Sequence, residues 1–184
     1  MRNAFNQFFK EPLQRARQKH IHWQIIVSGS RDQAHENFRN AMISHPGAIN
    51  LLLVDAEAEV KTYGEVWQHL LTRESWINPK VDNDRCHLMV CTMEAWFVAD
   101  RETLTHYFGK PPNTVKGYAD IEQVPKSTIE GIMAKVSKRL GKREYHKIHD
   151  GTRLLSSINP EIVQSKAPHC RRLFEELIRV IEAL

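Results

Sequence analysis

The sequence lacks most of the features that would place it in a class at once. It has three cysteines (Cys86, Cys91 and Cys170), an odd number without CxxC spacing, so a disulfide framework and a cysteine-based zinc site lose their support. A reducing, cytoplasmic location is therefore expected. No apolar run approaches the roughly 18 residues needed to span a bilayer, and the N-terminus has no long apolar segment typical of a secretory signal. We therefore expect no membrane partner.

Three well-known functional motifs are also missing. The chain contains no GxGxxG, no GxxxxGK[ST] and no GxSxG. Dinucleotide binding, P-loop nucleotide binding and nucleophile-elbow hydrolysis therefore lose their main support. There is no internal repeat and no low-complexity segment.

The chain does contain three short apolar runs with helical patterns between them. The runs are "HWQIIVSG" (22–29), "INLLLV" (49–54) and "CHLMVCTM" (86–93). Continuous apolar strands separated by helices predict an α/β fold, with a small, mostly parallel sheet flanked by helices. With 184 residues, 41% of them hydrophobic, we expect one domain spanning 1–184. Its sheet-containing core would cover 1–108, and a helical, basic C-terminal part would cover 109–184.

Capping residues mark the expected helix boundaries. "SRDQ" at 30–33 and "STIE" at 127–130 read as capping boxes, and Asp100 reads as an N-cap between two short helices. Asn159–Pro160 and Pro168 are typical helix starts. An amphipathic helix should open the chain, with Pro12 near a break.

Acidic side chains follow two of the predicted strands. Asp55 and Glu57 come after the second strand, and Glu94 follows the third. Residues i and i+2 of a strand point to one side, and parallel strands end at one edge, so these carboxylates can converge. Such oxygen ligands suit Mg²⁺ or Mn²⁺. The alternative is a strand end entering water, where acids are common, and Glu59 is a weaker ligand candidate.

Basic side chains cluster late in the chain, within a net charge of +4. They are Lys126, Lys135, Lys138, Arg139, Lys142, Arg143, Lys147 and Arg153. We expect Lys142, Arg143, His146 and Lys147 to contact the phosphates of a nucleic acid, since nearby cations disfavour metal binding by His146 and His149. The alternative is a solvated helix face. A nucleophilic pair of His169 and Cys170 is disfavoured, because adjacent residues on a helix diverge in direction.

Five blocks in this order resemble an uncharacterised bacterial family named domain of unknown function 4276. They are "NLLLVDAEAEV", "WQHLLTRESW", "CHLMVCTMEAWFVAD", "YHKIHDGTRLL" and "APHCRRLF", and together they span nearly the whole chain. The resemblance implies a Toprim-like fold that binds Mg²⁺ through an acidic pair, here Asp55 and Glu57. Glu94 matches the acid of the "MEAW" block. The family also implies an ATPase partner and a role in defence against phages.

The resemblance breaks at the N-terminus. Family members usually begin with a strand and a Glu that precede the helix corresponding to Asn3–Leu13, where this chain starts. Either the true start lies upstream, or the chain is a degenerate scaffold, or a partner supplies the strand. We expect a Mg²⁺-dependent nuclease in which Asp55 and Glu57 bind metal and Glu94 is a further ligand or the general base. The alternative is a non-catalytic module that binds nucleic acid or a partner ATPase.

Overall fold

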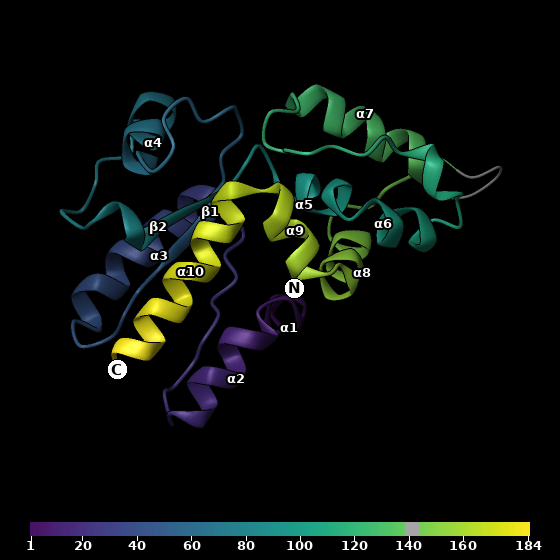
Figure 1. Ribbon diagram of the computed structural model, residues 1–184. Coiled ribbons are helices and arrows are strands. Elements are labelled where there is room, and N and C mark those ends of the chain that lie inside the picture. The colour runs from purple at the N-terminus through teal and green to yellow at the C-terminus, as the bar shows by residue number, and fades with distance from the viewer. Residues whose placement is uncertain (139–143) are drawn as a thin grey trace.

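Two short parallel strands, β1 (Leu52–Asp55) and β2 (Cys86–Met89), form the sheet of this protein. The computed structural model describes residues 1–138 and 144–184 (Figure 1). In the register of the two strands, Leu52 of β1 lies opposite Cys86 of β2, and Asp55 lies opposite Met89. The predicted α/β class with a small parallel sheet and a helical C-terminal part is confirmed.

The other elements in the described residues are helices. They are α1 (Arg2–Phe8), α2 (Lys10–Gln18), α3 (Arg31–Ser44), α4 (Val66–Glu74), α5 (Met93–Ala99), α6 (Arg101–Tyr107), α7 (Lys126–Ser137), α8 (His149–Ser157), α9 (Pro160–Lys166) and α10 (Pro168–Ala183), with 3₁₀ turns η1 (Asn83–Arg85) and η2 (Pro112–Thr114). None of these helices is long and apolar enough to cross a membrane.

Helices cover both faces of the sheet, because alternate side chains of the strands point to opposite sides. Leu52 and Val54 pack with Phe38 of α3 and Leu70 of α4 in a smaller hydrophobic cluster. The intervening Leu53 packs on the larger cluster, to which α10 contributes. Burial on both faces explains why the strand sequences are apolar throughout.

The larger cluster joins the N-terminal helices to the middle and the end of the chain. Phe8 of α1 stacks on Trp96 of α5 with ring centroids 5.0 Å apart, and it meets Phe174 of α10 edge-on at 5.6 Å. All three side chains are nearly fully buried. Burying side chains of this size contributes about 2–3 kcal/mol each to stability. Segments distant in sequence therefore share one core, and α5 lies inside it.

Side-chain caps fix the starts of α3, α6 and α9. Ser30 Oγ accepts the Gln33 N–H at 3.1 Å, Asp100 Oδ1 accepts the Thr103 N–H at 3.3 Å, and Asn159 Oδ1 accepts the Glu161 N–H at 2.9 Å. Each bond satisfies one backbone donor that the first turn leaves unpaired.

Prolines lie close to two further helix boundaries, the break between α1 and α2 and the start of α7. The N-terminal helix is broken at Phe9, where α1 ends and α2 follows. Pro12 lies three residues later and has no N–H to donate to the preceding turn, so a break near it was predicted and is found. α7 begins at Lys126 after Pro125, so the expected capping box at 127–130 lies within the helix and is wrong as a start.

Residues 22–29 are the clearest departure from the prediction of a buried strand. They run without regular structure, and none of their backbone groups bonds to another backbone group in the described residues. Trp23 and Ile25 rest on the larger cluster, whereas Ile26 is 60% and Val27 43% exposed. A strand exists only where a neighbour pairs with it, and β-branched composition alone could not provide one.

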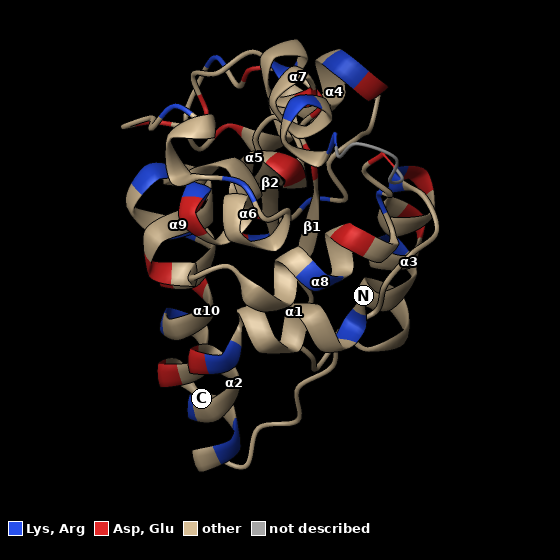
Figure 2. Ribbon diagram, turned by 90° about the vertical axis from the view of Figure 1, so that its right-hand side faces the viewer, with Lys and Arg blue, Asp and Glu red and all other residues tan. Residues whose placement is uncertain are grey.

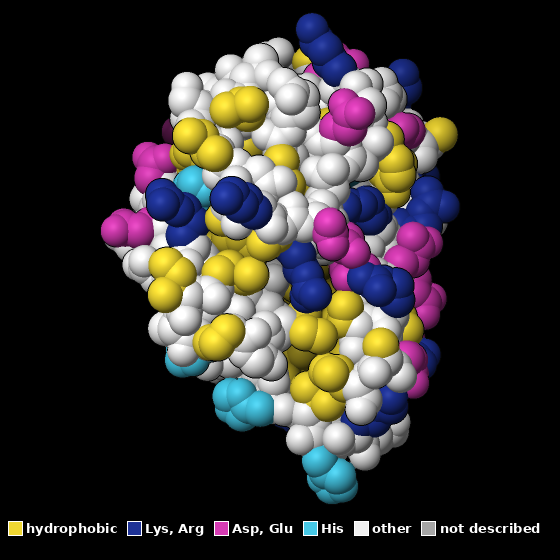
Figure 3. All heavy atoms as spheres, turned by 90° about the vertical axis from the view of Figure 1, so that its left-hand side faces the viewer, with side chains coloured by type: hydrophobic (Ala, Val, Ile, Leu, Met, Phe, Trp, Pro, Cys, Tyr) yellow, Lys and Arg dark blue, Asp and Glu magenta, His cyan; other side chains and the backbone are white. Residues whose placement is uncertain are grey.

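The surface mixes charge with scattered hydrophobic side chains. Figure 2 shows Lys and Arg segments interspersed with Asp and Glu on the side where α8 faces the viewer. Figure 3 shows hydrophobic side chains between charged ones on the opposite side. Exposed hydrophobic residues include Ile43 of α3, Leu71 of α4 and Ile77. Single exposed apolar residues of this kind are ordinary on protein surfaces.

Candidate metal and nucleic-acid site

Asp55 ends β1 and points to the helix that follows β2. Its Oδ1 accepts the backbone N–H of Met93, in the first turn of α5, at 2.8 Å. The side chain is only 14% exposed. Burial, and next the negative charge of Glu94, raise the pKa of Asp55 to about 6, although Lys147 and the Met93 N–H oppose the rise. Asp55 is thus a carboxylate whose charge is poorly compensated by its surroundings.

Glu94 lies one residue beyond Met93, in the same first turn of α5. Its side chain is 11% exposed, and the Tyr145 hydroxyl donates to its Oε1 at 3.0 Å. Burial, followed by the charge of Glu94, raises the pKa of Tyr145, so this hydroxyl remains a donor. Gly151 of α8 permits the contact, because a Cβ there would lie 3.2 Å from the Tyr145 hydroxyl. Glu94 is therefore fixed in direction.

Lys147 links the two carboxylates. Its Nζ lies 4.0 Å from Asp55 Oδ2 and 4.0 Å from Glu94 Oε1. The structure therefore brings together the acids that follow β1 and β2, as their positions in the chain predict. The Lys147 side chain is 63% exposed, so its charge is well solvated and its attraction to the carboxylates is weak.

Asp150 shapes the turn that carries Lys147. This nearly buried carboxylate accepts the His146 N–H at 2.7 Å and the Tyr107 hydroxyl at 3.0 Å. It also bonds to His149 Nδ1 at 2.9 Å. These contacts hold the turn before α8 against α6, which places Lys147 and Tyr145 beside the carboxylates.

Glu57, the third predicted metal ligand, is bonded to a different cation from the one that Asp55 and Glu94 share. β1 ends at Asp55, and Glu57 has a left-handed backbone with φ of 64°, so strand alternation does not reach it. Its carboxylate pairs with Lys126 of α7. Burial opposes ionisation of Glu57, but the hydrogen bond and charge of Lys126 outweigh it and lower the pKa.

The predicted ligands do not form a ready three-ligand site. Within residues 1–138 and 144–184, no three His, Cys, Asp or Glu side chains are arranged to hold a metal ion. Metal binding by Asp55, Glu57 and Glu94 stays a prediction.

The predicted phosphate contacts are described only in part. Lys142 and Arg143 lie outside the described residues. His146 and Lys147 are exposed on the turn before α8, and His146 Nδ1 accepts the His149 N–H at 3.1 Å. Of the two described residues of this predicted surface, Lys147 borders the carboxylates.

Sequence reasoning missed two partners in the site. Tyr145 lies in the "YHKIHD" block, but its pairing with Glu94, 51 residues earlier, has no local signal. Lys126 was counted only as one of several basic residues. Its contact with Glu57 spans 69 residues of sequence.

The fold and the site define a class: a small α/β domain with paired carboxylates where two parallel strands end. The family described as "Domain of unknown function (DUF4276)" matches residues 3–178, and this chain belongs to it. Neither a curated protein nor a solved structure matches the chain.

Proposed function

We propose that this protein is a nuclease that cleaves phosphodiester bonds in nucleic acid with the help of Mg²⁺ or Mn²⁺. The observation that carries the proposal is the convergence of Asp55 and Glu94 on one cation, the ammonium group of Lys147. Two largely buried carboxylates that share an exposed lysine are a site where a divalent ion would relieve repulsion between like charges.

The residues fit a hydrated Mg²⁺ ion. Mg²⁺ is commonly bound by one or two carboxylates, and water and substrate phosphate complete its coordination. Asp55 and Glu94 would supply those carboxylates once Lys147 swings away, and Glu57 would join only if its pair with Lys126 opened. When bound, the ion would polarise a phosphoryl oxygen and lower the pKa of a water molecule.

The chain's own side chains would position the substrate and move the proton. The Met93 N–H fixes Asp55, and the Tyr145 hydroxyl fixes Glu94, which would serve as a ligand or accept the proton of the attacking water. Lys147 and His146, together with Lys142 and Arg143, would bind backbone phosphates. Such contacts are independent of sequence and weaken with salt.

The wider setting of this proposal comes from family resemblance. A Toprim-like nuclease of this kind would act with a partner ATPase in defence of bacteria against phages. Co-purification of the chain with an ATPase would support this setting, and isolation of the chain alone from its native cells would count against it.

A second candidate function is a non-catalytic module that binds nucleic acid or a partner ATPase. It is favoured by the pairing of Glu57 with Lys126, which leaves one of the three predicted ligands engaged elsewhere. In this reading Lys147 stays beside Asp55 and Glu94, and no metal ion replaces it.

The test compares the wild-type chain with Asp55→Ala in cleavage of labelled single-stranded and double-stranded DNA and RNA. We expect cleavage only with Mg²⁺ or Mn²⁺, and a loss of about a hundredfold to a thousandfold in Asp55→Ala, since metal catalysis contributes several kcal/mol. Glu102→Ala, which removes an exposed carboxylate of α6, is the matched control and should cleave normally. Equal cleavage by wild type and Asp55→Ala would remove these residues from the mechanism. Nucleic-acid binding without cleavage would establish the second candidate.

A further inference from the structure

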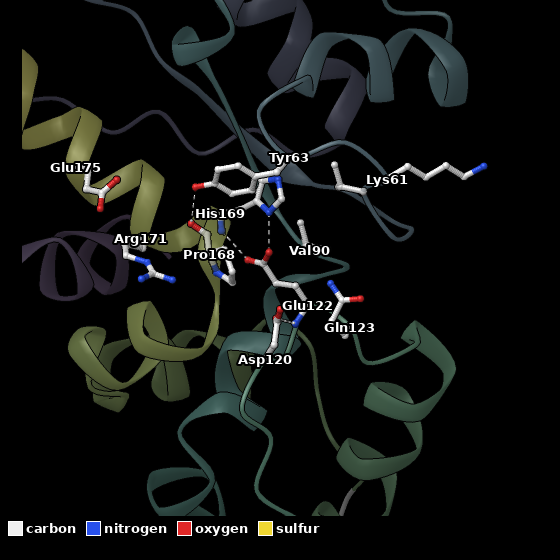
Figure 4. A pocket seen from close by; sticks show the side chains of 11 residues that line it. Lys61, Tyr63, Val90, Asp120, Glu122, Gln123, Pro168, His169, Arg171 and Glu175 are labelled. Atoms are coloured by element: carbon white, nitrogen blue, oxygen red, sulfur yellow. Dashed lines mark hydrogen bonds and ion pairs between the residues drawn. The ribbon is translucent and has the colours of Figure 1, made fainter.

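A separate cavity of about 590 Å³ lies between the loop after β1, the end of β2 and the start of α10 (Figure 4). Its apolar wall includes Val60, Val90 and Pro168. None of its lining residues belongs to the group of Asp55, Glu94 and Lys147. A cavity of this size holds a small molecule such as a mononucleotide.

The floor of the cavity holds a buried histidine with a fixed orientation. Glu122 accepts the His169 backbone N–H at 2.8 Å and faces its Nδ1 at 2.6 Å, and both side chains are 5% exposed. A carboxylate only accepts hydrogen bonds, so Nδ1 carries the proton that it donates to Glu122, and Nε2 of that neutral tautomer is an acceptor. Figure 4 shows Glu122 on the Nδ1 side of the ring.

Nε2 of His169 is buried and has no hydrogen-bond partner in the part of the chain that the structure describes. A buried acceptor without a partner costs about 1–3 kcal/mol and calls for an explanation. A ligand that donates an N–H to Nε2 would supply the missing bond.

Tyr63 forms an exposed aromatic wall beside this histidine. Its ring meets the His169 ring edge-on with centroids 4.9 Å apart, and the residue is 57% exposed. One hydrogen bond, from its hydroxyl to the Pro168 carbonyl at 3.3 Å, fastens the side chain. A small shift of Tyr63 would open Nε2 and offer a face on which a planar base can stack.

Charged side chains at the rim of the cavity determine where the charged group of a ligand can lie. Lys61 and Arg171 are exposed and lie on opposite sides of the His169 ring in Figure 4. Asp120 is occupied, because its Oδ1 accepts the Glu122 N–H at 2.9 Å. Glu175 is an exposed rim acid that would repel an anion, so a phosphate would lie toward Lys61 or Arg171.

We propose that this cavity binds one nucleotide of the nucleic acid on which the protein acts. The base stacks on Tyr63 and donates an N–H to Nε2 of His169, and the phosphate pairs with Lys61 or Arg171. The inference rests on the proposed function for the identity of the ligand, and it adds a second, base-contacting site to that function.

The test is isothermal titration calorimetry with the four ribonucleoside 5′-monophosphates and with inorganic phosphate. We expect binding of at least one nucleotide, with inorganic phosphate weaker by tenfold or more. His169→Asn keeps an amide N–H near the Nδ1 position but removes Nε2, and it should weaken nucleotide binding by about tenfold, the value of one hydrogen bond. The double variant Lys61→Ala/Arg171→Ala should also lower the affinity, whereas Arg39→Ala on the exposed face of α3 should not.

Several outcomes would overturn the inference. They are no binding of any nucleotide at millimolar concentration, equal binding of inorganic phosphate, or wild-type affinity in His169→Asn. If His169→Asn fails to fold, unchanged affinity in the double variant still refutes it. Metal-dependent cleavage without nucleotide binding would refute this inference alone, and nucleotide binding without cleavage would refute only the proposed nuclease activity.

Discussion

Asp55 is a largely buried carboxylate and Glu122 a fully buried one, and their surroundings are opposite in character. The Glu122 carboxylate receives two close donors, both from His169. Asp55 receives one backbone N–H, has Glu94 nearby, and is approached only to 4.0 Å by an exposed lysine. A fully satisfied carboxylate stabilises the fold, whereas a poorly compensated one lowers stability and leaves a place for a cation.

The largest expected effect on stability comes from removing the satisfied carboxylate. Glu122→Ala leaves the His169 N–H and the ring donor unpaired in a buried place. We expect a loss of about 3 kcal/mol in the free energy of unfolding, measured by urea denaturation at neutral pH. Glu175→Ala, at an exposed acid on α10, is the matched control and should change stability by less than about 0.5 kcal/mol. If Glu122→Ala also changed the free energy of unfolding by less than about 0.5 kcal/mol, Glu122 would not be the stabilising carboxylate that the comparison with Asp55 requires.

Replacing the poorly compensated carboxylate should act in the other direction. The pKa of Asp55 is raised from 3.8 to about 6, so the folded chain holds this proton to a higher pH than the unfolded chain does. Stability is therefore lost as the pH rises from about 4 to 6, and the shift corresponds to about 3 kcal/mol. Asp55→Asn avoids that loss and can still accept from Met93. We expect it to be more stable than wild type by up to about 3 kcal/mol at pH 7, and equal to it near pH 4, in denaturation measured at both values.

Glu57→Gln supplies the internal control for that experiment. The pKa of Glu57 is lowered, chiefly by Lys126 against the effect of burial, so its ionised form adds stability above the usual glutamate pKa. The stability that Glu57 adds disappears as the pH falls through its folded-state pKa. Glu57→Gln should therefore destabilise the protein at pH 7. If Asp55→Asn and Glu57→Gln changed the stability at pH 7 in the same direction, burial of an uncompensated charge would not be what distinguishes Asp55 from Glu57.

The smallest expected effect concerns the orientation of Glu94. Tyr145→Phe removes one hydrogen bond, 3.0 Å long, to a nearly buried carboxylate. We expect a loss of about 1–2 kcal/mol in thermal or chemical denaturation at pH 7. Tyr63→Phe also removes one hydroxyl that bonds at an exposed position, and it should cost less. A larger loss in Tyr63→Phe would contradict the assignment of Tyr145 as a buried support of Glu94.

Sequence reasoning succeeded where the decisive interactions are local. Ser30, Asp100 and Asn159 each accept a backbone N–H two or three residues away, so the local sequence pattern predicted these helix starts. The end of β1 was also predictable, because the apolar run stops at Asp55. The apolar run at 86–93 instead continues past Met89, where β2 ends. The proximity of the acids beyond the two strands followed from the rule for parallel sheets.

Sequence reasoning failed where pairing depends on the rest of the fold. The run at 22–29 has strand composition, yet in the described residues no neighbouring backbone bonds to it. Glu57 was expected to align with Asp55, but the chain leaves β1 between them. The pairing of Glu122 with His169 joins residues 47 apart, and no spacing rule indicates it.

The packing of α1 against α8 has a practical consequence for anyone who fuses another protein or a purification tag to this chain. Met1 lies beside α8, within 4.0 Å of Thr152, just after the turn that carries Lys147. The other terminus lies at the far end of α10 (Figure 1). An addition before Met1 would therefore begin against α8, whereas an addition after Leu184 would extend from the end of α10, so assays of cleavage should use chains extended at Leu184.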